Sequence, residues 1–127
     1  MKTTILLVED EEENQLLGMT VLKPLGVEVL LAQNGREALA LAAEKVPDLI
    51  LLDIIMPGLT GLEVLERLKA DAKTKDIPVM MLTSRQVPEE FRKAQELGAK
   101  GFLNKPYDID AFLSRVCLQL GLPVPRT

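Results

Sequence analysis

The sequence predicts an α/β domain built around a parallel sheet. Short apolar runs alternate with segments whose apolar residues recur at helical spacing, and this alternation occurs about five times along the chain. The runs are rich in Ile, Leu and Val, which is typical of strands that helices cover on both faces. The expected strands are residues 5–8, 27–32, 49–52, 79–82 and 101–103.

The first three expected helices have start signals. The glutamates at positions 11–13 follow the first strand, where carboxylates interact favourably with the positive end of a helix dipole. Asn34 with Glu37, and Thr60 with Glu63, have the spacing of a capping box. The apolar residues that the second and third helices would bury are Ala38, Leu39, Ala42, Leu62, Leu65 and Leu68.

The last two expected helices have stop signals as well. Pro88 suits a first helical turn, and Gly98 is placed to end that helix. Asp108 can cap the final helix, and Gly121 can end it. Their apolar residues follow the spacing of buried stripes. These are Phe91, Ala94 and Leu97 in the fourth helix, and Ile109, Phe112, Leu113, Val116 and Leu120 in the fifth.

The length and composition fit one globular domain. With 127 residues, of which 47% are hydrophobic and 27% charged, the chain can bury a single core and has little room for disorder. We expect residues 1–121 to form the domain, and residues 122–127 to be a C-terminal tail or the stub of a linker. Pro123 and Pro125 fit either interpretation.

The charge and the apolar runs exclude several classes of function. The 15 basic and 19 acidic residues give a net charge of -4, which argues against a nucleic-acid surface. The apolar runs are too short to span a bilayer, and residues 1–4 lead directly into a strand instead of a signal-peptide core. A cytoplasmic protein with no nucleic-acid or membrane partner is expected.

Histidine is absent, and Cys117 is the only cysteine. No imidazole base is available, and the usual zinc ligand sets lack their nitrogen donors. One cysteine forms no internal disulfide, which is compatible with a reducing compartment. Because Cys117 lies in a helical pattern without a cationic neighbour, it is expected to be a small hydrophobe and not a reactive thiol.

Acidic residues follow two of the expected strands directly. Glu9 and Asp10 come after residues 5–8, and Asp53 comes after residues 49–52. Open α/β sheets bind ligands at this edge. Three carboxylates meeting there would repel one another without a cation, and Mg²⁺ is the natural candidate. A competing interpretation makes Glu9 and Asp10 solvated residues at a helix start, but the placement of Asp53 disfavours it.

A hydroxyl and an ammonium group are expected at the same edge. The fourth strand ends in Thr83 and Ser84, and Lys105 follows the fifth strand. A carboxylate of Asp53 that attacks phosphorus would form an acyl phosphate, whose charge a metal, Lys105 and Thr83 could neutralise together. Taken singly, Thr83 would be a turn residue and Lys105 a surface lysine.

Six segments form an ordered pattern along nearly the whole chain. They read Val8-Glu9-Asp10, Asn34-Gly35-Arg36-Glu37-Ala38-Leu39, Pro47-Asp48-Leu49-Ile50-Leu51-Leu52-Asp53-Ile54-Ile55-Met56-Pro57-Gly58, Leu82-Thr83, Leu97-Gly98-Ala99 and Lys105-Pro106. In their order and spacing they resemble the receiver domains of two-component response regulators. The resemblance implies a flavodoxin-like, doubly wound fold, with five parallel strands in the order 2-1-3-4-5 and five helices.

The resemblance also implies the chemistry of the site. Asp53 would accept a phosphoryl group from a partner histidine kinase or histidine phosphotransfer protein. Mg²⁺ would be bound by the carboxylates of Glu9, Asp10 and Asp53 and by the backbone carbonyl of Ile55, and Lys105 would contact the phosphoryl group. Such a protein catalyses only its own phosphorylation and dephosphorylation, so it is not counted as an enzyme.

A switch is implied as well. Thr83 would contact the phosphoryl group, and Phe102 matches the position of the family's switch aromatic. Its ring would move inward and change the surface of the fourth helix, fifth strand and fifth helix for a downstream effector protein. By analogy, a partner would dock near the first helix at Asn14, Gln15 and Gly18. The chain is expected to be a monomer or a weak dimer.

Departures from the common receiver pattern are modest. Residues 59–61, Leu-Thr-Gly, stand where many members have Met-Asp-Gly, and Glu9 replaces a first Asp. Phe102 has no phenolic hydroxyl to strengthen the switch. Ile55 and Arg85 flank the pocket where side chains gate the attacking water, so the lifetime of the acyl phosphate is not predicted.

Two other functions compete with the phosphoacceptor. The first is a degenerate receiver that acts as a phosphorylation-independent protein-binding platform, which the intact acidic, hydroxyl and ammonium positions disfavour. The second is a phosphatase with an aspartyl nucleophile, which lacks an evident cap or substrate pocket in so short a chain. A stand-alone shuttle is favoured over an excised domain of a larger regulator.

Overall fold

The chain folds around one five-stranded sheet in this computed structural model, which describes residues 2–84, 87–105 and 108–125. All neighbouring strands are parallel, and their order is β2-β1-β3-β4-β5. The expected fold class and strand order are therefore confirmed. The strands are β1 (Thr4–Val8), β2 (Glu28–Ala32), β3 (Leu49–Asp53), β4 (Val79–Thr83) and β5 (Gly101–Asn104).

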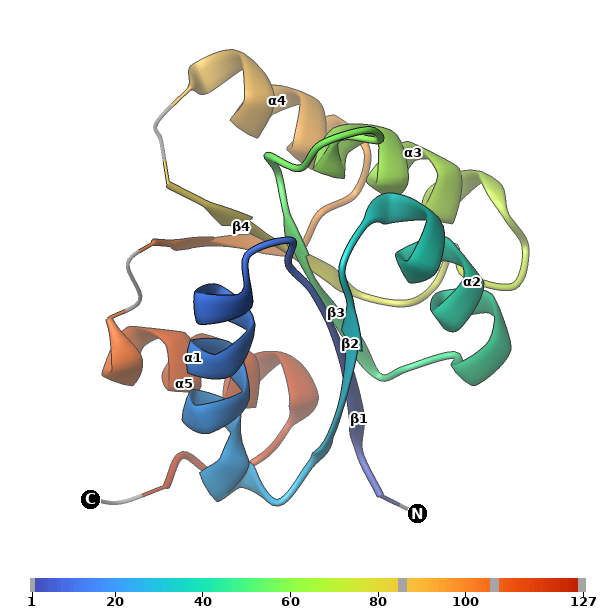
Figure 1. Cartoon of the computed structure of the whole chain (residues 1–127). Helices are drawn as coiled ribbons and strands as arrows, with labels where there is room; N and C mark the ends of the chain where they lie inside the picture. Colours follow the sequence, from blue (N-terminus) through green and yellow to red (C-terminus); the bar gives the residue numbers. More distant parts are fainter. Residues whose placement is uncertain (1, 85–86, 106–107, 126–127) are drawn as a thin grey trace.

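Helices cover both faces of the sheet (Figure 1). The helices α1 and α5 lie on one face, and α2, α3 and α4 lie on the other. Because β1 has β2 on one side and β3 on the other, the sheet has a topological switch point at the C-terminal end of β1. The helices are α1 (Glu12–Leu22), α2 (Gly35–Lys45), α3 (Gly61–Ala70), α4 (Pro88–Glu96) and α5 (Ile109–Leu120), with a short 3-10 helix, η1 (Lys23–Leu25), after α1.

Alternate strand residues supply two hydrophobic clusters, one on each face of the sheet. In β1, Ile5 and Leu7 pack with residues of α1 and α5, whereas Leu6 and Val8 pack with residues of α2, α3 and α4. All four side chains are fully buried. Each contributes roughly 1.5–3 kcal/mol by leaving water. Burial on both faces explains why the strand reads as a continuous apolar run.

The capping signals act as expected at α3 and partly at α2. Thr60 accepts a hydrogen bond from the N–H of Glu63, whose carboxylate accepts one from the N–H of Thr60, so the capping box is complete. Asn34 accepts from the N–H of Glu37. The carboxylate of Glu37 instead accepts from the N–H of Gln33, so only half of the box forms at α2.

One expected core position in the final helix is wrong. Asp108 caps α5 by accepting a hydrogen bond from the N–H of Ala111, and Gly121 ends the helix with a left-handed φ of 71°. Ile109, however, is 52% exposed. It occupies the first position of α5, and the buried part of the stripe begins one turn later at Phe112.

The C-terminal part of the chain bears on two further expectations. Cys117 is buried in α5, and burial raises the pKa of its thiol, which agrees with a small hydrophobe. Residues 122–125 have no regular structure, and residues 126–127 of the expected tail lie outside the described residues. Among the helices described, none combines the length and the apolar character that a membrane span requires.

Candidate functional site

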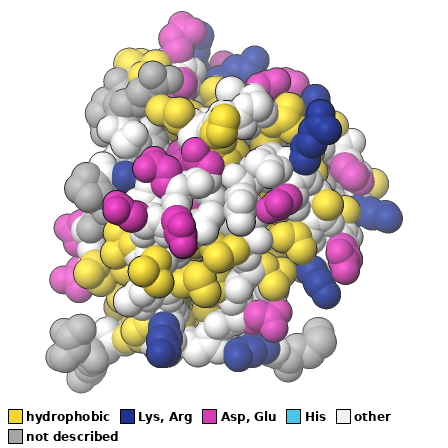
Figure 2. Space-filling model, viewed as in Figure 1, with side chains coloured by type: hydrophobic (Ala, Val, Ile, Leu, Met, Phe, Trp, Pro, Cys, Tyr) yellow, Lys and Arg dark blue, Asp and Glu magenta, His cyan; other side chains and the backbone are white. Residues whose placement is uncertain are grey.

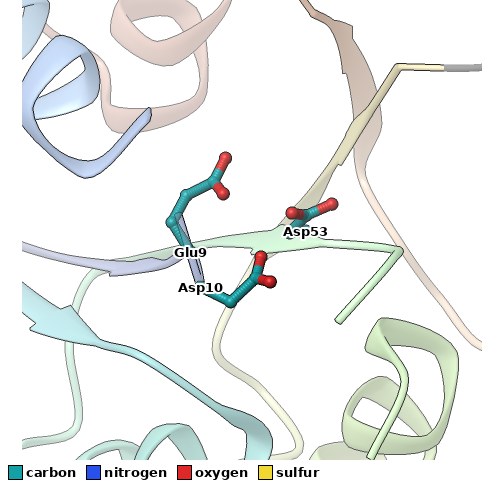
Figure 3. Close-up of side chains that lie close together, drawn as sticks. All are labelled: Glu9, Asp10 and Asp53. Carbon is teal, nitrogen blue, oxygen red and sulfur yellow. The ribbon is translucent and has the colours of Figure 1, made fainter. Parts of the chain in front are cut away.

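The three expected carboxylates meet at the C-terminal edge of the sheet. Glu9 and Asp10 follow β1, and Asp53 is the last residue of the adjacent β3. One carboxylate oxygen from each lies within 4.8 Å of the others (Figure 3). Glu9 and Asp53 are buried, while Asp10 is half-buried. The switch point of the sheet therefore carries a compact acidic cluster.

Lys105 is positioned inside this cluster. Its ammonium group lies 2.5 Å from Oε1 of Glu9 and 2.9 Å from Oδ2 of Asp53. Its backbone N–H donates to the carbonyl of Thr83 at 2.8 Å, which fixes the loop after β5 against the end of β4. Thr83 itself is buried at that strand end. The fold thus brings Glu9, Asp53, Thr83 and Lys105 to one edge of the sheet. In the sequence, 96 positions separate Glu9 from Lys105.

Burial and hydrogen bonding shift the pKa in opposite directions, both at Glu9 and at Lys105. Burial raises the pKa of Glu9 to about 7, and the hydrogen bond from Lys105 lowers it only in part. For Lys105, burial lowers the pKa, but the hydrogen bonds to Glu9 and Asp53 outweigh that effect and raise it. Lys105 therefore remains an ammonium group. Its positive charge neutralises negative charge at this edge, as a metal ion would.

The stability of the metal-free protein is expected to fall as the pH rises from about 4.5 to about 7. In this window the Glu9 carboxyl keeps its proton in the folded state but loses it in the unfolded chain. The folded state then binds more protons, so the free energy of unfolding decreases by up to about 3 kcal/mol. Urea unfolding with EDTA at a series of pH values measures this slope. Glu9→Gln should flatten it, and a rise through the window would contradict the assignment.

A pocket of about 270 Å³ opens beside the acidic cluster. Asp53 and Lys105 line it together with Ile55. The N–H of Ile55 donates to Oδ1 of Asp53 at 3.1 Å, which orients that carboxylate. Ile55 is exposed, as expected for a residue flanking the pocket, whereas Arg85 lies outside the described residues. The remaining lining residues are Glu11, Asn14 and Ser84.

Sequence reasoning gave no site role to Glu11 or Ser84, which both line the pocket. Each directly follows a residue that was selected, and that adjacency was the only available signal. The side chain of Gln15 donates to the backbone carbonyl of Glu9 at 2.8 Å, and it thereby ties α1 to the turn that carries the acidic pair. Gly18, expected near a docking surface, is buried against Leu7 and offers no side chain to a partner.

Phe102 lies on β5, three residues before Lys105. Its ring is half-buried and contacts the ring of Phe91 in α4, with the centroids 4.7 Å apart in an edge-to-face arrangement. This contact links β5 to α4. The carbonyl of Phe102 also accepts a hydrogen bond from the guanidinium of Arg115 in α5. One residue thus joins the three elements of the expected switch surface.

The donor set fits Mg²⁺. Three carboxylates can supply hard oxygen ligands within 4.8 Å of one another, and the adjacent pocket leaves room for the water and phosphate oxygens that this ion prefers to keep. Nitrogen and sulfur ligands, which would favour zinc, are absent from the cluster.

The fold and the site together define an α/β protein with an acidic pocket at the switch point of its sheet. The chain belongs to the response regulator receiver domain family, whose model matches residues 5–117. It is a receiver domain of the kind found in two-component systems, and receiver domains bind Mg²⁺ at an acidic pocket.

Individual relatives agree with this assignment. The polar-differentiation response regulator DivK of Brucella anthropi is 35% identical over 121 residues, which cover 95% of this chain and 98% of that protein. The phosphate regulon transcriptional regulatory protein PhoB of Pseudomonas aeruginosa is 37% identical over 113 residues. That match covers 89% of this chain but only 49% of PhoB, so the chain spans about half the length of this relative.

Solved structures give the same result. Chemotaxis protein CheY4 of Vibrio cholerae has a TM-score of 0.88 and 32% sequence identity, over 94% of this chain and 100% of that one. The receiver domain of the sensor histidine kinase PA1611 from Pseudomonas aeruginosa has a TM-score of 0.86 and 26% identity, over 95% and 99% of the two chains. A magnesium ion is coordinated in the active site cleft of the PA1611 domain.

Proposed function

We propose that this chain is a phosphoacceptor in a two-component or phosphorelay system, and that a partner phosphohistidine transfers its phosphoryl group to Asp53 in a Mg²⁺-dependent reaction. The observation that carries the proposal is the cluster of Glu9, Asp10 and Asp53 around one point, with Lys105 bound to two of them. These 127 residues contain no histidine, so the phosphohistidine lies outside them.

The transfer is a displacement at phosphorus. A carboxylate oxygen of Asp53 forms the new O–P bond while the N–P bond of the phosphohistidine breaks. The imidazole keeps the electron pair and takes a proton from solvent. The N–H of Ile55, 3.1 Å from Oδ1, holds the carboxylate in one orientation for this attack.

Glu9, Asp10, Asp53 and the carbonyl of Ile55 would hold Mg²⁺, which supplies charge neutralisation to the transferring group. Lys105 adds a second positive charge, because its ammonium already lies 2.9 Å from Oδ2 of Asp53. The phosphoryl oxygens would then become a further partner of that ammonium, beside Glu9 and Asp53. Loss of the phosphoryl group would follow by hydrolysis in the solvent-exposed pocket, so the chain turns over no separate substrate.

The phosphorylated state would be read through Thr83 and Phe102. The hydroxyl of Thr83, at the end of β4, would bond to the phosphoryl group, and the ring of Phe102 would move into the space beside it. The contact between Phe102 and Phe91 would then change, and with it the surface formed by α4, β5 and α5. A downstream effector protein must bind this arrangement more tightly than the resting one, because a switch works only through differential affinity.

With Mg²⁺ and a small acyl phosphate as donor, the intact protein is expected to gain the mass of one phosphoryl group. The reason is that the acidic cluster, Lys105 and Asp53 provide the complete chemistry without a kinase. Intact-mass spectrometry measures the gain, and the same reaction with EDTA serves as the control. An unchanged mass with Mg²⁺ present would contradict the proposal and favour a phosphorylation-independent binding platform.

A further inference from the structure

β2 lies at one edge of the sheet, and no strand pairs with its outer side in the part of the chain that the structure describes. On the side of β1, the N–H of Glu28 and the carbonyl of Ala32 are hydrogen-bonded. Backbone groups alternate sides along a strand, so the N–H and C=O groups of Val29 and Leu31 point outward. An unpaired edge of this kind is a template for a further strand.

The two edges of the sheet are protected differently. At β5, the guanidinium of Arg115 donates to the outward carbonyl of Phe102 and places a charged side chain over that edge. The middle of β2, in contrast, consists of Val29, Leu30 and Leu31, which are all half-buried. It carries no charge and no proline, which are the usual features that prevent pairing. The β2 edge is therefore open to another chain.

An apolar groove lies along the same edge. Four apolar residues line it, Leu16 and Met19 of α1 with Val27 and Val29, together with the polar residues Thr20 and Lys23, and its volume is about 400 Å³. Leu16 is 67% exposed, so its side chain covers little of this chain's own core. Figure 2 shows hydrophobic side chains gathered over α1 and β2 in the lower half of the view. Apolar surface is thus continuous from the helix to the strand edge.

The two ends of α1 carry charges of opposite sign, although Glu28 adds an acidic group at the start of β2. Acidic side chains gather above the patch in Figure 2, and below it lie basic side chains with an acidic one beside them. The first turn of α1 carries Glu12 and Glu13, whereas Lys23 lies in η1 at the opposite end of the helix. A two-fold axis through the middle of β2 would place Glu12 and Glu13 of one copy beside Lys23 of the other.

We propose that a second copy of this chain docks on this edge, with the two β2 strands paired antiparallel and the two α1 helices side by side. The sheets of the two copies join through the outward backbone groups of Val29 and Leu31. Leu16 and Met19 of each copy cover the groove of the other. The interface leaves α4, β5 and α5 uncovered, and it does not depend on phosphorylation of Asp53.

Sedimentation velocity of the whole chain over a concentration series tests the interface. A monomer–dimer equilibrium is expected, with a dissociation constant below about 1 mM. Leu16→Lys should weaken the dimer at least about tenfold, because it places two like charges near the two-fold axis and removes apolar contact. The matched control is Leu118→Lys on α5, since Leu118 is 84% exposed and lies outside the patch. This control should leave the equilibrium unchanged.

Hydrogen exchange gives a second measurement that does not rely on a variant. The amides of Val29 and Leu31 should exchange rapidly in dilute protein and more slowly as the concentration rises, because the dimer occupies their N–H groups. A chain that stays monomeric up to about 1 mM would overturn the proposal. So would a dimer that Leu118→Lys dissociates while Leu16→Lys does not, or a dimer in which these two amides gain no protection.

Discussion

Asp53→Asn is expected to abolish the phosphoryl gain with Mg²⁺ and a small acyl phosphate. The amide oxygen of asparagine is a far weaker nucleophile than a carboxylate, and the change also removes one ligand of the acidic cluster. The fold should survive, because Glu9 still pairs with Lys105 at 2.5 Å. Intact-mass spectrometry of the variant beside the unmodified protein measures the effect, which should be complete and not partial.

The matched control for this variant is Asp48→Asn, at the other end of the same strand. Asp48 precedes β3 and is exposed, and its carboxylate accepts a hydrogen bond from the N–H of Thr4. An amide oxygen can accept the same bond, so stability should change little. This variant should be phosphorylated like the unmodified protein. A phosphoryl group gained by Asp53→Asn would show that another residue is the acceptor.

The acidic site was predictable because it depends on strand ends. An apolar run that stops at a carboxylate places that carboxylate at the C-terminal edge of a parallel sheet, and this holds for Asp53 and for Glu9 with Asp10. The pairing of β1 with β3, which brings the groups together, was not contained in the residues themselves. It followed from the resemblance to receiver domains, since local periodicity says nothing about the order of strands.

Features that depend on distances in the folded chain could not be predicted from the sequence. The capping spacing of Asn34 and Glu37 was correct, but only the folded backbone decides that the glutamate reaches Gln33. Ile109 fits the helical stripe, yet it lies one turn before the first buried residue of α5. The contact of Gln15 with the carbonyl of Glu9 has no sequence signal, because a glutamine on a first helical turn is ordinarily solvated.

Gly61→Ala is expected to lower the free energy of unfolding by more than about 3 kcal/mol, above the usual range for an overpacked core position. Gly61 is the first residue of α3, and its N–H donates to the carbonyl of Ile54 at 2.8 Å. A Cβ atom there would lie 2.1 Å from the carbonyl oxygen of Asp53 and 2.7 Å from the Cα of Ile54. Both are backbone atoms, so rotation of a side chain does not relieve the contact.

Gly61→Ala separates a steric effect on stability from an effect of backbone conformation. Gly61 does not have a positive φ, so alanine costs nothing in backbone conformation there, and the whole loss comes from the close approach of α3 to β3. Gly101→Ala is the control, because its Cβ would lie 3.4 Å from the flexible end of Met80 and its φ is also not positive. Urea unfolding should show little change for Gly101→Ala. Equal stability of the two variants would mean that the start of α3 can move away from the strand that carries Asp53.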